Sequence, residues 1–150
     1  MVCGLPVFHT GDMSEDARPT AFVSEADGIF GAELISALVA RGHQVFALTR
    51  SVESARIVRG SGAVAVIGDL LTPGRWQDEA AADWVFHLPS PQPAHPIWTR
   101  RTRERTALAA RARVLMDRNL FEAVSAGTTR RIVYVADIRL YGAVGTRPIT

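Results

Sequence analysis

Short runs of apolar residues alternate along the chain with longer segments in which apolar residues recur every three or four positions. The short runs are typical of strands buried on both faces and occupy residues 21–23, 43–49, 63–67, 84–88 and 131–135. The longer segments have helical spacing and cover residues 28–41, 51–59, 76–82 and 100–126. The sequence therefore predicts five strands separated by four helices.

The residues at the segment ends agree with this division. Gly42 follows the first predicted helix and Gly127 the last, and glycine commonly ends helices. Ser51 is a suitable N-cap for the second helix, which Gly60 would close. Strands that alternate with helices in this way indicate a parallel sheet with helices on both faces. Right-handed crossovers then predict an α/β, Rossmann-like, doubly wound sheet.

The composition fits one folded domain that follows an irregular tail. Of the 150 residues, 47% are hydrophobic and 21% are charged, with a formal net charge of +2. Residues 11–19 (GDMSEDARP) are polar and acidic and end in proline, so we expect residues 1–19 to form an irregular N-terminal tail before a domain over residues 20–150. No apolar run reaches the ~18 residues of a membrane span, and no secretory signal is visible. We therefore expect a cytoplasmic protein with no membrane partner.

The reactive side chains narrow the possible chemistry further. All 17 basic residues are arginine, which excludes lysine chemistry such as Schiff-base formation within this sequence. The single cysteine, Cys3, cannot form a disulfide framework, and His9, His43 and His95 lack metal-ligand spacing. Arginines crowd residues 100–113 without any nucleic-acid motif beside them, so we expect a solvated helix face and no nucleic-acid partner.

Six segments carry a resemblance to a known family. In order they are AFVSEADGIFGAEL, RGHQVFALTR, AVAVIGDLL, DWVFHL, NLFEAVSAG and RIVYVADIRLYG. Over residues 20–142 the chain resembles the extended short-chain dehydrogenase/reductase family, in its NAD-dependent epimerase/dehydratase group. The resemblance implies an NAD(P)-binding Rossmann-like domain that lacks the family's C-terminal substrate lobe. It also implies a homodimer formed through the long helix over residues 100–126.

The family's phosphate loop has the pattern G-x-x-G-x-x-G, which is only partly present. Glu25 stands at the first glycine position, and Gly28 and Gly31 stand at the other two. The resemblance implies that Gly28, Ile29 and Gly31 contact the cofactor, while Glu25 and Asp27 place acids at its diphosphate. A carboxylate about 5 Å from a phosphate costs roughly 1–3 kcal/mol, against roughly 0.3–2 kcal/mol gained from a helix N-terminus. The sequence therefore leaves open that no dinucleotide binds.

Three further residues are implied on the adenosine side of the cofactor. Arg50 ends the second predicted strand, where an arginine favours NADP through its 2′-phosphate. Alternatively, Arg50 pairs with Glu25 and closes the cleft. Asp69 matches the residue that contacts adenine in the family, and Leu70 follows it. Asp69 is equally well explained as a turn residue.

The family's catalytic residues are not matched. The family has Ser or Thr after the fifth strand and a Tyr-x-x-x-Lys pair further on. Asp137 stands at the serine position, four residues before Tyr141, and the sequence contains no lysine. Arg113 stands where the family often has asparagine. The candidate acid–base residues are therefore Asp137, Tyr141 and His87, although His87 also matches a structural histidine of the family.

Three functional hypotheses remain. The first is an NAD(P)-dependent oxidoreductase or epimerase that is not competent alone for standard Tyr/Lys hydride transfer. The second is a cofactor-free cyclase, isomerase or lyase that uses the same cleft, and the third is a non-catalytic subunit that binds a partner. A small-molecule ligand would lie at the carboxyl edge of the sheet, where open α/β sheets bind ligands. The fifth strand would be an exposed edge unless the tail or a second subunit covers it.

Overall fold

The order of strands and helices matches the predicted alternation. The computed structural model describes residues 18–88, 100–125 and 127–136. Asp137, Tyr141, most of the predicted tail and the end of the predicted domain therefore lie outside the described residues. The elements are β1 (Ala21–Val23), α1 (Ile29–Ala40), β2 (Val45–Thr49), α2 (Val52–Gly60), β3 (Val64–Ile67), α3 (Trp76–Ala80), β4 (Trp84–His87), α4 (Arg100–Ser125) and β5 (Arg131–Tyr134).

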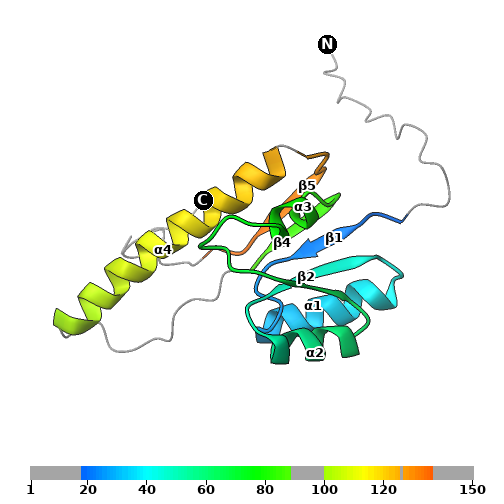
Figure 1. The fold of residues 1–150 in the computed structure, drawn as a ribbon, viewed down its shortest axis with the longest axis horizontal. Coiled ribbons are helices and arrows are strands. Elements are labelled where there is room, and N and C mark those ends of the chain that lie inside the picture. The colour runs from blue at the N-terminus through cyan, green and yellow to red at the C-terminus, as the bar shows by residue number, and fades with distance from the viewer. Residues whose placement is uncertain (1–17, 89–99, 126, 137–150) are drawn as a thin grey trace, which may run out of the picture.

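The described strands form one parallel sheet in the order β3-β2-β1-β4-β5. In Figure 1, α1 and α2 lie on one side of this sheet, and α3 and α4 lie on the other. This is the doubly wound, Rossmann-like arrangement that the sequence predicts. The chain order reverses between β1 and β4, and ligands of such sheets bind beyond the carboxyl ends of the strands at this reversal.

Each face of the sheet has its own hydrophobic core because the strand side chains alternate between faces. In β1, Ala21 and Val23 pack toward α1 and α2, whereas Phe22 packs toward α3 and α4. The α1/α2 core contains Ala26, Ile35, Leu38, Val45, Ala47, Val58 and Ala63 in addition. The α3/α4 core contains Leu48, Leu70, Trp76, Ala80, Ala82, Val85, Leu120, Ala123 and Val124. Burial on both faces makes β1 a rigid centre for the loop that follows it.

The helix ends show which predicted capping residues act as such. Gly42 takes a left-handed φ of 78° after α1, and its N–H donates to the carbonyl of Val39 at 2.8 Å. Ser51 caps α2, because its Oγ accepts from the backbone N–H of Ser54 at 3.1 Å. The prediction that Gly60 closes α2 is wrong in detail. Gly60 is still helical, and the left-handed residue is Gly62, with a φ of 84°.

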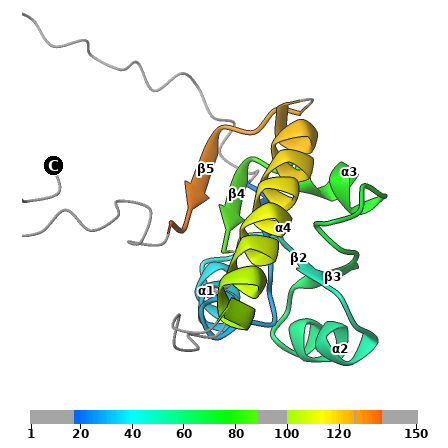
Figure 2. The same cartoon turned by 90° about the vertical axis from the view of Figure 1, so that its left-hand side faces the viewer.

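The strand β5 lies at an exposed edge of the described sheet, as expected for a fifth strand that nothing covers, although its apolar run by itself is typical of burial on both faces. It pairs with β4 and is the edge strand of the described sheet, as Figure 2 shows. Its residues are all exposed, with Ile132 at 41% and Val133 at 48%. The apolar sequence therefore indicates a strand correctly, but the edge position leaves it uncovered among the described residues. None of the helices in the described part of the chain is long and apolar enough to cross a membrane.

Candidate functional site

The loop that follows β1 has the shape of a glycine turn although a glutamate occupies it. Glu25 adopts a left-handed φ of 51°, a conformation that L-residues other than glycine take at a cost. The N–H of Gly28 donates to the carbonyl of Glu25 at 3.2 Å, and the N–H of Ala26 donates to the carbonyl of Leu48 at 3.1 Å. The turn that the family builds with its first glycine is therefore formed here by Glu25.

Gly31 brings α1 into close contact with this loop. A Cβ atom at Gly31 would lie 2.8 Å from the carbonyl oxygens of both Glu25 and Ala26. Side-chain atoms do not fit at that distance from backbone, so position 31 needs glycine. Gly28 is the N-cap of α1 and supplies no side-chain cap. The first N–H groups of a 12-residue helix are thus without a side-chain cap, which suits an anion.

The two acids of the loop differ in their surroundings. Asp27 Oδ2 accepts a hydrogen bond from Ser54 Oγ at 3.2 Å, which ties this carboxylate to α2. Glu25 is half-buried within the turn itself. One carboxylate about 5 Å from a phosphate costs roughly 1–3 kcal/mol, which is similar to what a helix N-terminus contributes. The loop therefore combines a turn and an uncapped helix N-terminus, which suit an anion, with the carboxylate of Glu25, which opposes one.

The predicted adenosine-side residues lie beyond β2 and β3. Arg50 is exposed at the end of β2. Asp69 forms a turn, since its Oδ1 accepts from the N–H of Leu71 at 2.9 Å. Leu70 is only 3% exposed and belongs to the α3/α4 core. Its carbonyl accepts from Asn119 Nδ2 at 2.7 Å.

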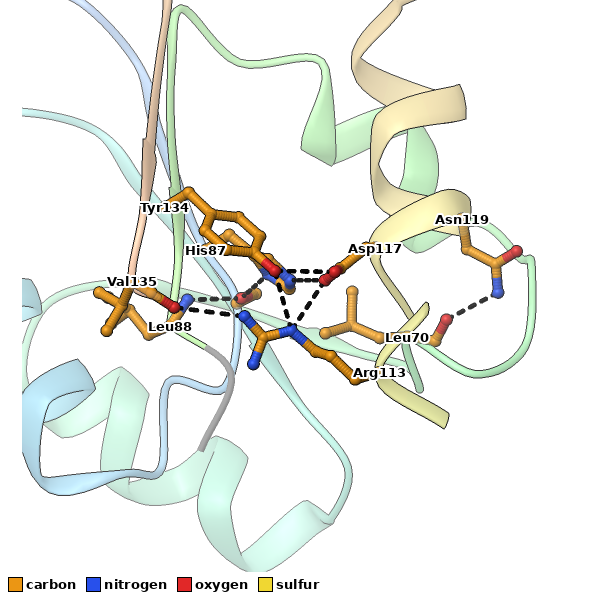
Figure 3. Close-up of polar contacts among 9 residues, drawn as sticks. Leu70, His87, Leu88, Arg113, Asp117, Asn119, Tyr134 and Val135 are labelled. Atoms are coloured by element: carbon orange, nitrogen blue, oxygen red, sulfur yellow. Dashed lines mark hydrogen bonds and ion pairs between the residues drawn. The ribbon is translucent and has the colours of Figure 1, made fainter. Parts of the chain in front are cut away.

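His87 lies at the end of β4 and is enclosed completely. Its exposure is 0%, and both ring nitrogens have partners (Figure 3). Nδ1 lies 2.8 Å from the Oγ of Ser24, at the end of β1, and Nε2 lies 2.8 Å from Oδ1 of Asp117, on α4. Burial lowers the pKa of His87 below its ordinary value of 6.5, although the hydrogen bond to Asp117 opposes this shift. The arrangement favours a structural role, because no ring nitrogen is open to a substrate.

Asp117 also joins His87 to the exposed end of β5. Tyr134 OH donates to Asp117 Oδ2 at 2.8 Å, and Arg113 Nε donates to Asp117 Oδ1 at 3.0 Å. Arg113 Nη2 donates to the carbonyl of Val135 at 3.2 Å, and its guanidinium lies 4.9 Å from the centre of the Tyr134 ring. Partial burial, followed by the hydrogen bond to Asp117, raises the pKa of Tyr134 above 10.0. Figure 3 shows this cluster between α4 and the carboxyl ends of β4 and β5.

The sequence indicates only part of this cluster. His87 and Arg113 are singled out by position, whereas Ser24, Asp117 and Tyr134 are not. The helical period of α4 could have indicated Asp117. Arg113 and Asp117 are four residues apart, and they share the helix face that carries the buried Leu120. A charged pair on an apolar face predicts a buried polar contact.

Comparison with protein families identifies the class of protein that this fold and loop represent. The family model for the NAD dependent epimerase/dehydratase family matches residues 21–150. The chain therefore belongs to this family, as the resemblance predicts. Among curated proteins, none matches the chain significantly.

Several solved structures share the fold. An NAD-dependent NDP-hexosamine 5,6-dehydratase, TunA, is 21% identical, with a TM-score of 0.67 over 89% of this chain and 42% of its own. A UDP-glucose-4-epimerase from Stenotrophomonas maltophila, with bound NAD, is 17% identical, with a TM-score of 0.65 over 83% of this chain and 39% of its own. Gre2 from Candida albicans, in complex with NADPH, is 18% identical, with a TM-score of 0.58 over 78% and 36%. The chain thus spans about two fifths of the length of these structures.

Proposed function

We propose that this chain forms the NAD(P)-binding module of an oxidoreductase of the epimerase/dehydratase type. The observation that carries the proposal is the loop after β1, in which Glu25 takes the left-handed turn and Gly31 allows α1 to approach two backbone carbonyls. The dinucleotide would lie along the carboxyl edge of the sheet, with its diphosphate at the N-terminus of α1. Gly28 and Ile29 would contact it through backbone atoms.

The adenosine half would lie over the ends of β2 and β3. Arg50 is exposed there, and a guanidinium matches the geometry of a 2′-phosphate, so we expect NADP to bind more tightly than NAD. Leu70 would contribute backbone only, because its side chain is in the core. Asp69 would face the adenine while it keeps its turn.

Hydride transfer would require a bound nicotinamide and acid–base groups that lie outside the described residues. A bound nicotinamide would supply a hydride acceptor or donor at the carboxyl edge of the sheet. His87 orders this edge but does not transfer protons to a ligand, since both its nitrogens are occupied and it is 0% exposed. Asp137 and Tyr141 stay candidates for acid–base catalysis. Because the sequence has no lysine, we propose that standard Tyr/Lys hydride transfer needs groups from outside these 150 residues.

Calorimetric titration with NADPH, NADP, NADH and NAD tests the proposal. We expect the NADP forms to bind with a Kd in the micromolar to millimolar range and Arg50→Ala to remove their advantage over the NAD forms. Arg56→Ala, which removes an exposed arginine of α2, is the matched control and should bind as the wild type does. We expect Glu25→Gly to bind all four forms more tightly. Absence of binding by both the wild type and Glu25→Gly contradicts the proposal.

The exposed edge of β5 favours a second candidate function, that of a subunit that pairs with another chain. Edge strands with exposed backbone groups and apolar side chains are templates for strand addition. We expect light scattering to show a homodimer, and Val133→Lys to dissociate it if β5 forms the interface. A wild-type protein that is monomeric at high concentration contradicts the homodimer.

A further inference from the structure

The contacts of Ser24 and Asp117 together give the direction of the hydrogen bonds around a neutral His87 ring. The backbone N–H of Leu88 donates to Ser24 Oγ at 3.2 Å, so the hydroxyl oxygen is already an acceptor. The hydroxyl proton is then available for His87 Nδ1, at 2.8 Å. On the other side of the ring, Nε2 faces a carboxylate oxygen of Asp117 at 2.8 Å and must carry a proton to bond to it. With these directions, no buried side-chain polar atom of the described residues lacks a partner.

We infer that Ser24, His87 and Asp117 form a directional hydrogen-bond relay that holds His87 as the neutral Nε2–H tautomer and makes Asp117 a positioning residue for the loop after β1. The relay ends at the residue that immediately precedes Glu25. Ser24 is also fixed through its backbone, since its N–H donates to the carbonyl of Phe86 at 3.0 Å. The entry to the loop is thereby connected to α4, which lies on the opposite face of the sheet from α1 (Figure 1).

The relay has one protonation state in which every partner is satisfied. The charged and titratable groups that face His87 are Asp117 and Arg113 from α4 and Tyr134 from β5. A second proton on the ring would sit on Nδ1 and point at Ser24 Oγ. The Ser24 hydroxyl would then lose its acceptor, and no other acceptor bonds to it among the described residues. Protonation of His87 therefore reverses the bond to Ser24, whose Oγ then accepts from both Nδ1–H and Leu88 N–H while its own buried hydroxyl proton has no acceptor, and this cost destabilises the arrangement at the loop entry.

The unpaired hydroxyl proton of Ser24 has a consequence that rests on the proposed function. If the loop after β1 binds the diphosphate of a dinucleotide, binding weakens when His87 takes up a proton. Asp117 sets the pH at which this happens, because its negative charge stabilises the imidazolium. Asp117→Asn keeps an acceptor for Nε2–H but removes that charge. An opposite charge at this distance shifts a histidine titration by about one pH unit or more, so the variant should titrate at lower pH.

The relay is tested first on the wild-type protein, by long-range proton–nitrogen NMR of the histidine rings. Substitution of His9, His43 and His95 by Gln, one at a time, assigns the signals and leaves His87 intact. We expect the His87 ring at pH 7.5 to be protonated at Nε2 alone, and to titrate below 6.5. A ring that is protonated at Nδ1 alone, or one that titrates above 6.5, overturns the relay.

Dinucleotide binding then tests the role of Asp117. The Kd for NADP is measured by calorimetry from pH 8 to pH 4.5 for the wild type, Asp117→Asn and Glu122→Gln. Glu122 is an exposed acid on α4 that pairs with Arg118, so Glu122→Gln is the matched control. The ligand's own phosphates titrate identically in all three experiments, and only differences between proteins report on His87.

We expect the wild type and Glu122→Gln to lose at least threefold in affinity over the same acid range. For Asp117→Asn, this loss should occur about one pH unit lower or more. Superimposable pH profiles for all three proteins overturn the positioning role of Asp117. If no dinucleotide binds at any pH, the proposed function is wrong and the binding consequence is wrong with it, while the NMR tautomer still decides the relay.

Discussion

Because Glu25 has a left-handed backbone conformation, we predict that glycine at position 25 gives a more stable protein than alanine does. Glu25 has a φ of 51°, and the left-handed region costs an L-residue about 1–2 kcal/mol relative to glycine. Glycine also raises the conformational entropy of the unfolded chain, which offsets about 0.4–1 kcal/mol of this difference. Glu25→Gly should therefore exceed Glu25→Ala in free energy of unfolding by about 1 kcal/mol. Both variants lose the carboxylate and its contacts, so their difference isolates the backbone term.

The assay compares the glycine variant with the alanine variant at two positions, 25 and 33. The difference in free energy of unfolding between the two variants should have opposite signs at the two positions. Glu33 is an exposed glutamate within α1, where glycine costs about 1 kcal/mol relative to alanine. Urea denaturation should rank Glu25→Gly above Glu25→Ala, and Glu33→Gly below Glu33→Ala. In thermal scans each difference should be about 2–4 °C. If Glu25→Ala is as stable as Glu25→Gly, the turn is not strained and the glycine-like geometry of the loop is wrong.

Three further effects concern the loop, the α4 contact and pH. Gly31→Ala should lower the free energy of unfolding in urea by about 1–3 kcal/mol, because its Cβ meets two carbonyls at 2.8 Å. Gly28→Ala, with a nearest contact of 3.4 Å, should change it by less than about 0.5 kcal/mol, and equal effects would contradict this reasoning. Asn119→Ala should cost about 1–3 kcal/mol in the same assay, since it leaves the buried carbonyl of Leu70 without its donor, and a cost near zero would refute that role. The folded-state pKa of His87 is lowered, so the unfolded chain takes up the proton first as pH falls below 6.5. The free energy of unfolding in urea should therefore decrease as the pH falls from 7 to 5.5, by at most about 1.4 kcal/mol per pH unit from this group. A free energy that stays constant or increases over this range would contradict the burial of a neutral ring.

The fold could be predicted from sequence because its signals are local. The β1 run of three apolar residues, the Ser51 cap and the left-handed Gly42 each depend on neighbours within a few positions. The strand order also follows, because right-handed crossovers leave few arrangements open. The edge position of β5 is expected from the resemblance to the family, whereas its own apolar run is typical of a strand buried on both faces. Whether an apolar strand is covered depends on what packs against it, and the amino-acid sequence of the strand itself does not specify this.

The site was harder to predict because its contacts join distant parts of the chain. Ser24 and His87 are 63 residues apart, and His87 and Asp117 are 30 apart. Ser24 and His87 meet because β1 pairs with β4, and Asp117 reaches His87 because α4 packs on the sheet face that carries Phe22 and Val85. The resemblance to the family located the loop at Gly28 and Gly31 but not the conformation of Glu25. That conformation follows from the demands of the turn on whichever residue occupies it.

The division of the interior into two cores has a consequence for how the chain folds during synthesis. The buried residues of the α1/α2 core all lie between Ala21 and Ala63, whereas those of the α3/α4 core extend to Val124. The first core can therefore assemble on the ribosome while α4 is still untranslated. Because β1 pairs with both β2 and β4, a nascent chain that had formed only the first core would have an incomplete sheet, with Phe22 and Leu48 lacking their α3/α4 partners. The second core cannot form before α4 has been synthesised, so slow translation would leave Phe22 and Leu48 accessible to chaperones for longer.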